Sequence, residues 1–233
     1  MLAPFDQAIL GWLNSYVGSS YLFDEIVRSI TGWHFVRAGW LGCFVWWAWF
    51  AETDDHRRIK LLSALIAVIL IAAVSRGMQT LTFVHLRPFV VADAYGFQIP
   101  RNVEPFLTSR SSFPSDTATL YFAMAALVWC ISRWWGALAF AWVLLIAALP
   151  RVYLTYHWPS DVLAAFVLGT TAVILAYRYC LPGATNLHKF ERVRPEFFYP
   201  LLFVFIYQIV DAFDLVDRAV LGAKGLAKLA LGN

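Results

Sequence analysis

Six apolar runs, separated by shorter polar connections, make up most of the sequence. They cover about residues 35–50, 61–83, 117–131, 137–149, 162–179 and 200–216. A helix needs about 20 predominantly apolar residues to cross a bilayer, and the longer runs approach or reach that length. The composition agrees, because 61% of the residues are hydrophobic and 14% are charged, whereas a soluble domain is about half apolar and about a quarter charged. The sequence therefore predicts an all-α, polytopic membrane bundle of about six transmembrane helices.

The two ends of the chain differ from its middle. Residues 1–31 place apolar side chains at helical spacing, interrupted by polar ones such as Asp6, which predicts two amphipathic interfacial helices with a break near Gly18. Residues 32–216 form the predicted membrane domain, and residues 217–233 form a mildly basic amphipathic tail. The N-terminus lacks a basic segment followed by an apolar core, so we do not expect a cleavable signal.

The polar connections alternate between the two sides of the bilayer. Those at 52–60, 132–136 and 180–198 share one side and are rich in Lys and Arg, so the positive-inside rule predicts that they are cytoplasmic. The long connection at 84–116 and the segment 151–161 then meet on the extracytoplasmic side. We therefore expect a multi-pass protein of a bacterial-type inner membrane whose functional residues face the periplasm or the cell exterior.

The segment from Arg151 to Asp161 contains residue types that suit phosphate chemistry. Arg151 offers a planar fork of donors for phosphate oxygens. His157 can attack phosphorus or move a proton. Asp161 can hold the other imidazole nitrogen, and Pro159 favours a helix start whose free N–H groups point at an anion. A helix cap beside interfacial charges is the simpler interpretation of the same residues.

Other stretches on the predicted extracytoplasmic side can also be interpreted either as structural or as part of a phosphate site. Arg87-Pro88 is either an interfacial anchor or part of a phosphate site, and residues 113–116 are either a helix start or part of that site. Four arginines on this face form the expected phosphate cradle: Arg87, Arg101, Arg110 and Arg151. Three histidines are expected at the surface or the membrane interface: His34, His56 and His188.

The remaining composition indicates no other class of site. Cys43, Cys130 and Cys180 fit no metal-ligand spacing, so we expect them to act as small apolar side chains. The net charge of +3 and the lack of a strongly basic tail do not suggest nucleic-acid binding. No feature of the sequence indicates an oligomeric state.

The spacing of Arg151, His157 and Asp161 resembles the third motif of the type 2 phosphatidic acid phosphatase (PAP2) superfamily, the membrane-embedded lipid phosphatases. That motif reads Ser-Arg, five residues, His, three residues, Asp. The second family motif reads Pro-Ser-Gly-His or Pro-Ser-Asp-His, and the first reads Lys, six residues, Arg-Pro. The corresponding segments here are residues 80–88, 114–117 and 150–161. The resemblance covers about residues 76–170.

The resemblance implies a phosphatase that works through a phosphohistidine. His157 would attack phosphorus, and Asp161 would orient it. Arg87, Arg151 and the backbone near Ser115 would hold the phosphoryl oxygens, with the Ser115 hydroxyl as a further donor. Water would then cleave the phosphoenzyme. The implied partner is a lipid phosphate or diphosphate in the membrane, and the family mechanism uses no metal or cofactor.

Two positions depart from the family pattern in a way that affects the chemistry. The lysine of the first motif falls at Thr80, although Arg76 lies one helical turn earlier. The histidine of the second motif, which protonates the leaving group in the family, is replaced by Thr117, whose hydroxyl is a poor acid. The same region offers candidate auxiliary or substitute groups: His85, Glu104, Arg110, Asp116 and Thr117.

A missing acid affects a phosphate monoester more than a diphosphate. A monoester must expel a basic alkoxide, whereas a lipid diphosphate expels a phosphate monoester that is already a stable anion. General acid catalysis typically contributes about 10²–10⁴-fold. The missing acid therefore favours a diphosphate substrate, and the resemblance implies a polyprenyl diphosphate, with undecaprenyl diphosphate as the leading candidate. Two alternatives are a lipid phosphotransferase that uses His157 with an acceptor other than water, and a non-catalytic member that binds phospholipid head groups.

Overall fold

The computed structural model describes residues 3–33, 35–81, 85–101 and 111–211. Regular structure in these ranges is helical throughout, with short π- or 3₁₀-helical segments labelled η. The elements are, in chain order, α1 Pro4–Asn14, α2 Tyr21–Gly32, η1 Phe35–Gly39, α3 Trp40–Ala51, α4 Asp55–Leu81, η2 Pro88–Val90, α5 Ala92–Tyr95, α6 Asp116–Ile131, α7 Arg133–Trp142, η4 Val143–Ala148, α8 Leu149–Tyr153, α9 Pro159–Tyr179, α10 Ala184–Val193 and α11 Pro195–Val210. The predicted all-α class is confirmed.

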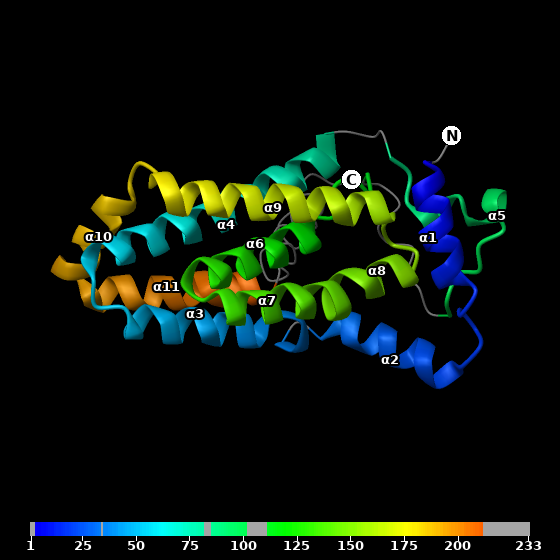
Figure 1. Cartoon of the computed structure of the whole chain (residues 1–233), viewed down its shortest axis with the longest axis horizontal. Coiled ribbons are helices and arrows are strands. Elements are labelled where there is room, and N and C mark those ends of the chain that lie inside the picture. Colours follow the sequence, from blue (N-terminus) through cyan, green and yellow to red (C-terminus); the bar gives the residue numbers. More distant parts are fainter. Residues whose placement is uncertain (1–2, 34, 82–84, 102–110, 212–233) are drawn as a thin grey trace, which may run out of the picture.

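The apolar runs of the sequence correspond to the long helices of a membrane bundle (Figure 1). Among the described residues, three helices are long and apolar enough to cross a membrane: α4, the continuous α7–η4–α8 helix and α9. The helices α6 and α11 are apolar but shorter, with 16 residues each. The segment formed by η1 and α3 covers the first predicted run. The predicted tail at 217–233 lies outside the described residues.

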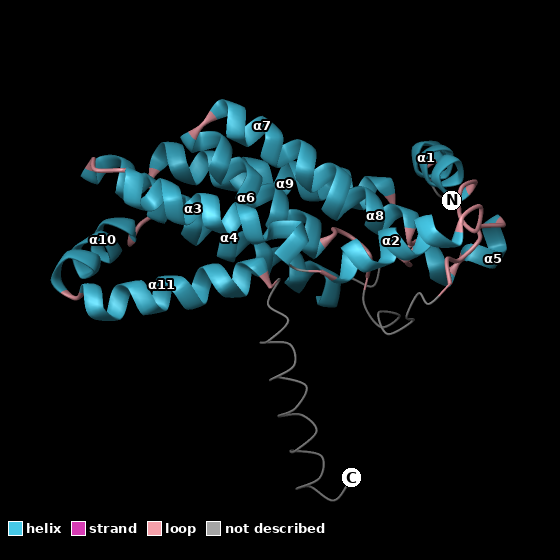
Figure 2. Cartoon of the chain, turned by 90° about the horizontal axis from the view of Figure 1, so that it is seen from below, coloured by secondary structure: helices cyan, strands magenta, loops and turns pink. Residues whose placement is uncertain are grey.

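Helix α6 occupies the middle of the bundle, in contact with α4, α7 and α9 (Figures 1 and 2). Its residues from Thr117 to Val128 are all buried, so this part of the helix has no exposed face. Gly169 of α9 allows a close approach, because a Cβ atom there would lie 2.5 Å from the carbonyl oxygen of Thr119. This packing fixes the middle of α9 against the first turn of α6. Both helices begin at the same end of the bundle, where the N–H of Ser115 donates to the carbonyl of Asp161.

The N-terminal helices α1 and α2 contact that same end of the bundle. They are separate helices, as predicted, and Gly18 between them has a φ of +77°. Asp6 on α1 accepts hydrogen bonds from the N–H and the hydroxyl of Ser160, both at 2.8 Å. Asn14 exchanges two hydrogen bonds with the backbone of Gln98. These contacts fix α1 to the first turn of α9 and to the connection that precedes α6.

The start of α4 differs from the sequence prediction. We predicted a polar turn over residues 52–60, but α4 already begins at Asp55. The reason is local, because the carboxylate of Asp54 accepts a hydrogen bond from the N–H of Arg57 at 2.8 Å and so caps the helix. The basic residues of this connection therefore belong to the first two turns of the helix.

His188 was predicted at the surface or interface, but its side chain is buried in a polar network at the far end of the bundle. Its Nδ1 atom lies 2.9 Å from Oε2 of Glu191, and Oε1 of Glu191 lies 3.0 Å from Nη1 of Arg58. The network joins α10 to α4 and satisfies charges that water would otherwise solvate. His56 is exposed, as predicted, and His34 lies outside the described residues.

Candidate active site

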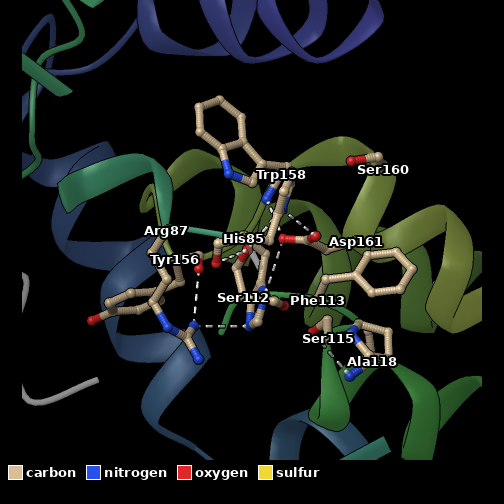
Figure 3. A network of polar contacts seen from close by, with 12 residues as sticks. His85, Arg87, Ser112, Phe113, Ser115, Ala118, Tyr156, Trp158, Ser160 and Asp161 are labelled. Atoms are coloured by element: carbon tan, nitrogen blue, oxygen red, sulfur yellow. Dashed lines mark hydrogen bonds and ion pairs between the residues drawn. The ribbon is translucent and has the colours of Figure 1, made fainter. Parts of the chain in front are cut away.

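Three separated stretches of the chain meet at the end of the bundle that carries α1 (Figure 3). They are residues 85–89, 111–117 and 151–161. Backbone hydrogen bonds join them: the N–H of Ser112 donates to the carbonyl of His85 at 2.9 Å, and the N–H of Phe89 donates to that of Thr155 at 3.1 Å. The convergence expected from the sequence is therefore present.

The turn that precedes His157 holds an uncommon backbone conformation. Thr155 has a φ of +58°, and its side chain is completely buried. The left-handed region is a genuine outlier for a β-branched residue, and such outliers concentrate at functional sites. The hydrogen bond from Phe89 and one from the N–H of Thr155 to the carbonyl of Val152 hold the turn in place. The two flanking segments thus determine where His157 lies.

His157 lies between α8 and α9 and is 1% exposed. Its Nδ1 atom is 2.9 Å from the carbonyl oxygen of Ser112 and 3.6 Å from Oδ2 of Asp161. A carbonyl oxygen only accepts hydrogen bonds, so Nδ1 carries the proton and the neutral ring has its lone pair on Nε2. Burial lowers the pKa of His157, and the nearby Arg87 charge adds to that effect against the opposing influence of Asp161. The ring is therefore a neutral base or nucleophile near neutral pH.

Asp161 is positioned by the start of α9. Pro159 occupies the first turn, and Oδ2 of Asp161 accepts a hydrogen bond from the N–H of Trp158 at 2.8 Å. This cap is the helix start that the sequence predicted. The carboxylate is completely buried, so its charge must be balanced by groups of the protein.

His85 partly balances the negative charge of Asp161. Its Nδ1 atom lies 3.2 Å from Oδ1 of Asp161 and 3.0 Å from Oγ of Ser112 (Figure 3). The contact with Asp161 raises the pKa of His85 against the opposing effect of partial burial. Asp161 therefore has one imidazole near each carboxylate oxygen, with His157 neutral and His85 more readily protonated.

Arg87 lies beside the free nitrogen of His157. Its Nη1 atom is 3.3 Å from Nε2 of His157, and it donates to the carbonyl of Tyr156 at 3.0 Å. Its Nη2 atom donates to the carbonyl of Ser111 at 3.4 Å. The side chain is 2% exposed, so a permanent positive charge is held where the lone pair of His157 points.

Arg151 adds a second guanidinium, on a side chain that is partly buried. It lies on α8, within electrostatic range of Arg87 and Asp116, and its Nε atom has no hydrogen-bond partner among the described residues. A buried donor without a partner is costly. An anion bound between Arg87 and Arg151 would satisfy this donor and offset the repulsion between the two charges.

Ser115 begins α6. Its Oγ atom accepts a long hydrogen bond from the N–H of Ala118 at 3.4 Å, which is the helix cap expected from the sequence. The hydroxyl proton is still available for a phosphoryl oxygen. The N–H of Ser115 donates to the carbonyl of Asp161 at 3.4 Å. Ser115 therefore joins α6 to α9 and lies at the start of both helices.

Arg76 and Asp116 form an ion pair at the start of α6. The Nη2 and Nε atoms of Arg76 lie 3.1 and 3.2 Å from Oδ2 of Asp116. The other oxygen, Oδ1, accepts a hydrogen bond from the N–H of Thr117 at 2.7 Å, and the Thr117 hydroxyl lies 3.4 Å from the same atom. The pairing favours the ionised carboxylate, so Asp116 is a poor candidate for a proton donor.

Three residues that the sequence analysis placed in or near the site are not found with the residues described above. Arg101 is exposed and lines a separate small pocket with Tyr21 and Asp24, so its expected place in the phosphate cradle is wrong. Glu104 and Arg110 lie outside the described residues. Among the residues that the structure describes, no group of three or more His, Cys, Asp or Glu side chains is arranged to hold a metal ion.

Comparison of the sequence with known proteins agrees with this arrangement of residues. A sequence profile described as the PAP2 superfamily matches residues 57–182, which is more than half of the chain. The chain belongs to the PAP2 superfamily. It is 32% identical over 132 residues to the putative undecaprenyl-diphosphatase YbjG of Escherichia coli (strain K12), across 57% of this chain and 61% of that protein. It is 24% identical over 153 residues to the bacitracin transport permease protein BcrC of Bacillus licheniformis, across 64% of this chain and 68% of that protein.

The alignment with YbjG thus spans less than two thirds of that relative. No solved structure matches the chain. A membrane location for this PAP2 protein is supported by its apolar helices and by its similarity to membrane proteins.

The PAP2 first motif lacks its lysine here, and the nearest cation on the same helix is Arg76, one turn earlier. Thr80 is exposed, and its hydroxyl donates to the carbonyls of Arg76 and Gly77 at 2.8 and 3.0 Å, so it bonds back to the preceding turn of its own helix. Arg76 points instead to Asp116, at the start of α6. A cation therefore reaches the second-motif segment from α4 even though the lysine is missing.

Two residues of this PAP2 site were not expected from the sequence. Ser112 binds His157 through its carbonyl and His85 through its hydroxyl. The side chain of Gln79, which is 1% exposed, donates to the carbonyl of Pro114 at 2.6 Å, and the backbone carbonyl of Gln79 accepts from the N–H of Ser111 at 3.0 Å. A glutamine near the end of an apolar run is a signal for such a role, because polar groups inside membrane bundles need partners. The role of Ser112 has no comparable signal.

Proposed function

We propose that this protein is a membrane phosphatase that hydrolyses a polyprenyl diphosphate through a phosphohistidine. The observation that carries the proposal is the orientation of His157, whose Nδ1 donates to the Ser112 carbonyl and whose unprotonated Nε2 lies 3.3 Å from Nη1 of Arg87. A protein that only binds head groups needs the arginine but not an oriented, unprotonated imidazole. The similarity to a protein named as a putative undecaprenyl-diphosphatase supports a diphosphate substrate.

The proposed chemistry has two steps. In the first, the lone pair of His157 Nε2 attacks the terminal phosphorus, the bond from phosphorus to the bridging oxygen breaks, and the lipid monophosphate leaves with the bonding electrons. Arg87 and Arg151 stabilise the charge on the transferred phosphoryl group, with Ser115 as a further donor. In the second, water attacks the phosphohistidine and passes a proton to His85, which the first step has left unprotonated. The bond from phosphorus to Nε2 breaks with its electrons returning to Nε2, and inorganic phosphate and neutral His157 are released.

His85 is the proposed substitute for the family's second-motif histidine. Thr117 lacks a proton acidic enough for transfer, and Asp116 is ion-paired with Arg76. His85 is held by Asp161 at 3.2 Å, and its pKa is raised by that contact. A protonated imidazole beside the nucleophile's carboxylate is a suitable acid near neutral pH. Proton donation to the leaving group matters less for a diphosphate than for a monoester, and this supports a diphosphate as the substrate.

The proposed site faces the extracytoplasmic side of the inner membrane. The basic connections at 52–60 and 180–198 lie at the end of the bundle that carries α10 (Figure 1). His157 lies in the connection from α8 to α9, both of which contact α1 at the other end. By the positive-inside rule the first end is cytoplasmic. The substrate would then be the carrier lipid diphosphate that envelope synthesis leaves on the outer leaflet.

The test is phosphate release by the purified protein in detergent, with a long polyprenyl diphosphate compared with phosphatidic acid. We expect release from the diphosphate, its loss in His157→Ala, and unchanged release in His56→Ala. His56 is a suitable control because it is an exposed histidine in the first turn of α4, at the opposite end of the bundle. A labelled substrate should leave an acid-labile, base-stable label on the protein.

Other outcomes would favour the alternative functions. Release that requires an added acceptor would indicate a phosphotransferase. Diphosphate binding without release, unaffected by His157→Ala and weakened by Arg151→Ala, would indicate a head-group binder and contradict the proposal.

A further inference from the structure

An apolar groove of about 400 Å³ lies on the side of the bundle, next to the candidate active site. It runs between the continuous α7–α8 helix and α9, with contributions from α1 and from Phe122 of the central helix α6. All of its lining side chains are apolar, and Leu163 and Leu144 line its open side with exposures of 54% and 43%. Its volume lies within the usual range for ligand sites, which is about 300–1,000 Å³.

The groove is formed by the same helices that carry the candidate site. Val152, which lines it, follows Arg151 directly, and Val162 follows Asp161 directly. From Pro159 the groove follows α9 toward Phe166, a distance of about 10 Å at 1.5 Å per residue. One end of the groove therefore lies at the depth of the proposed phosphate site, and the other reaches toward the middle of the bundle.

The two ends of the groove are built differently. At the site end, Phe5 and Ile9 of α1 contribute to the lining, and Asp6 between them binds Ser160 of α9. At the far end, the ring of Phe166 packs edge-to-face on Phe122 and at a steep angle on Phe140, with centroids 5.3 and 5.7 Å apart. The groove therefore has a wall of interlocked rings with a fixed shape.

We propose that this groove binds the first part of the polyprenyl chain of the substrate and so sets the depth of its diphosphate at His157. The inference rests on the proposed function. Lipid tails are as apolar as the groove, so filling it gains packing contacts rather than hydrophobic free energy. Its effect is to hold the diphosphate in register with His157 and to select a chain whose shape fits the aromatic wall.

A second groove provides a matched comparison. It also has a volume of about 400 Å³ and a largely apolar lining, but it lies between α4 and α11 and includes residues of α10, at the end of the bundle opposite the site. Ordinary membrane lipids can occupy both grooves. Only the groove beside α9 is lined by the residues that directly follow Arg151 and Asp161, so only that groove should affect the reaction.

The experiment fills each groove with one indole ring. Leu163 of α9 and Leu70 of α4 line the two grooves and are both 54% exposed, so Leu163→Trp and Leu70→Trp are matched substitutions that spare the core. Steady-state phosphate release is measured with a long polyprenyl diphosphate and with a five-carbon isoprenyl diphosphate. We expect Leu163→Trp to raise KM for the long substrate about tenfold or more, because a mismatch in an apolar pocket has effects of that order. The short substrate should be unaffected in Leu163→Trp, and both substrates should be unaffected in Leu70→Trp.

Binding of the same two diphosphates to the His157→Ala variant, with and without Leu163→Trp, tests the groove without catalysis. A loss of affinity for the long substrate alone supports the inference even if the wild-type protein releases no phosphate, an outcome that would contradict only the proposed function. Equal effects on the two substrates, equal effects of Leu163→Trp and Leu70→Trp, or no effect of Leu163→Trp would overturn the inference and indicate that the groove holds ordinary lipid.

Discussion

The Nδ1 atom of His157 donates its proton to the carbonyl of Ser112 at 2.9 Å, while the Asp161 carboxylate is more distant, at 3.6 Å. The carbonyl therefore fixes the tautomer of His157, which in many sites is the task of the carboxylate. The charge of Asp161 is shared with His85, which lies 3.2 Å from its other oxygen. Two imidazoles, the neutral His157 and the more basic His85, therefore lie beside the one buried carboxylate of Asp161. The first two predictions follow from that arrangement.

The first prediction concerns the dependence of kcat/KM on pH. His157 must be neutral to attack, and burial lowers its pKa, so the acidic limb should lie below the ordinary histidine value of about 6.5. His85 must be protonated to act as an acid, and Asp161 raises its pKa, so the alkaline limb should lie above about 6.5. Activity should therefore be highest between the two limbs, in a bell-shaped profile measured with the diphosphate.

The variant His85→Gln separates these two limbs. It should lower kcat/KM and remove the alkaline limb while leaving the acidic limb in place, because His157 is unchanged. An alkaline limb that persists in His85→Gln would show that another group supplies the proton.

Asp161→Asn should reduce kcat by about 10²–10⁴-fold with a small change in KM. The substitution removes the charge that favours a protonated His85 and that stabilises His157 as charge develops. The asparagine oxygen can still accept the hydrogen bond from the N–H of Trp158, so the start of α9 should remain folded. Steady-state kinetics measure the effect, and an unchanged melting temperature in detergent is the control. A kcat close to the wild-type value would show that Ser112 alone orients the nucleophile.

The ion pair between Arg76 and Asp116 should stabilise the folded protein. Arg76→Ala leaves a largely buried carboxylate without its cation, which should reduce the free energy of unfolding by about 1–3 kcal/mol. Thr80→Ala is the control, because Thr80 is exposed and bonds only to its own helix. The coupling free energy between the two residues is measured by thermal unfolding of three variants: Arg76→Ala, Asp116→Asn and the double variant. Additive effects would contradict a direct interaction.

The sequence predicts those parts of the site that depend on local patterns. The start of α9 follows from Pro159 and Asp161, which lie two residues apart, and the helix class follows from the apolar runs. The capped start of α4 was missed, although Asp54 is a local signal, because the basic residues of that connection resembled a polar turn. Local spacing is therefore sufficient for the helix class and for the start of α9, and it is the basis on which His157 is proposed as the nucleophile.

The contacts that organise the site depend on tertiary structure. Ser112 and His157 are 45 residues apart, and Arg76 and Asp116 are 40 residues apart. No periodicity in the sequence reports such pairs, since they form only when α4, α6 and α9 pack together. His188 was misassigned for the same reason, because its burial requires the contact between α10 and α4.

The attachment of α1 to α9 leads to the fourth prediction. Asp6 is 2% exposed and accepts two hydrogen bonds from Ser160, so Asp6→Ala should reduce the free energy of unfolding by about 1.5–3 kcal/mol. Hydrogen exchange should become faster in α1 and in the first turn of α9. The exposed neighbour Gln7 supplies the control, and Gln7→Ala should change neither property. Unchanged exchange in Asp6→Ala would mean that α1 is held mainly by its apolar contacts.

The last prediction tests the argument about the leaving group. Thr117→His restores the imidazole of the second family motif next to Asp116, which would help to keep it protonated. A monoester must expel an alkoxide, so its hydrolysis should rise by up to about 10²-fold. The diphosphate already has a stable leaving group and should gain much less. Because Thr117 is 7% exposed, Thr117→Gln controls for the added volume without adding an acid. Parallel assays of phosphatidic acid and a polyprenyl diphosphate give the ratio of the two rates. A ratio that stays constant would mean that proton donation does not limit monoester hydrolysis, and the preference for a diphosphate would then need another cause, such as the fit of the polyprenyl chain.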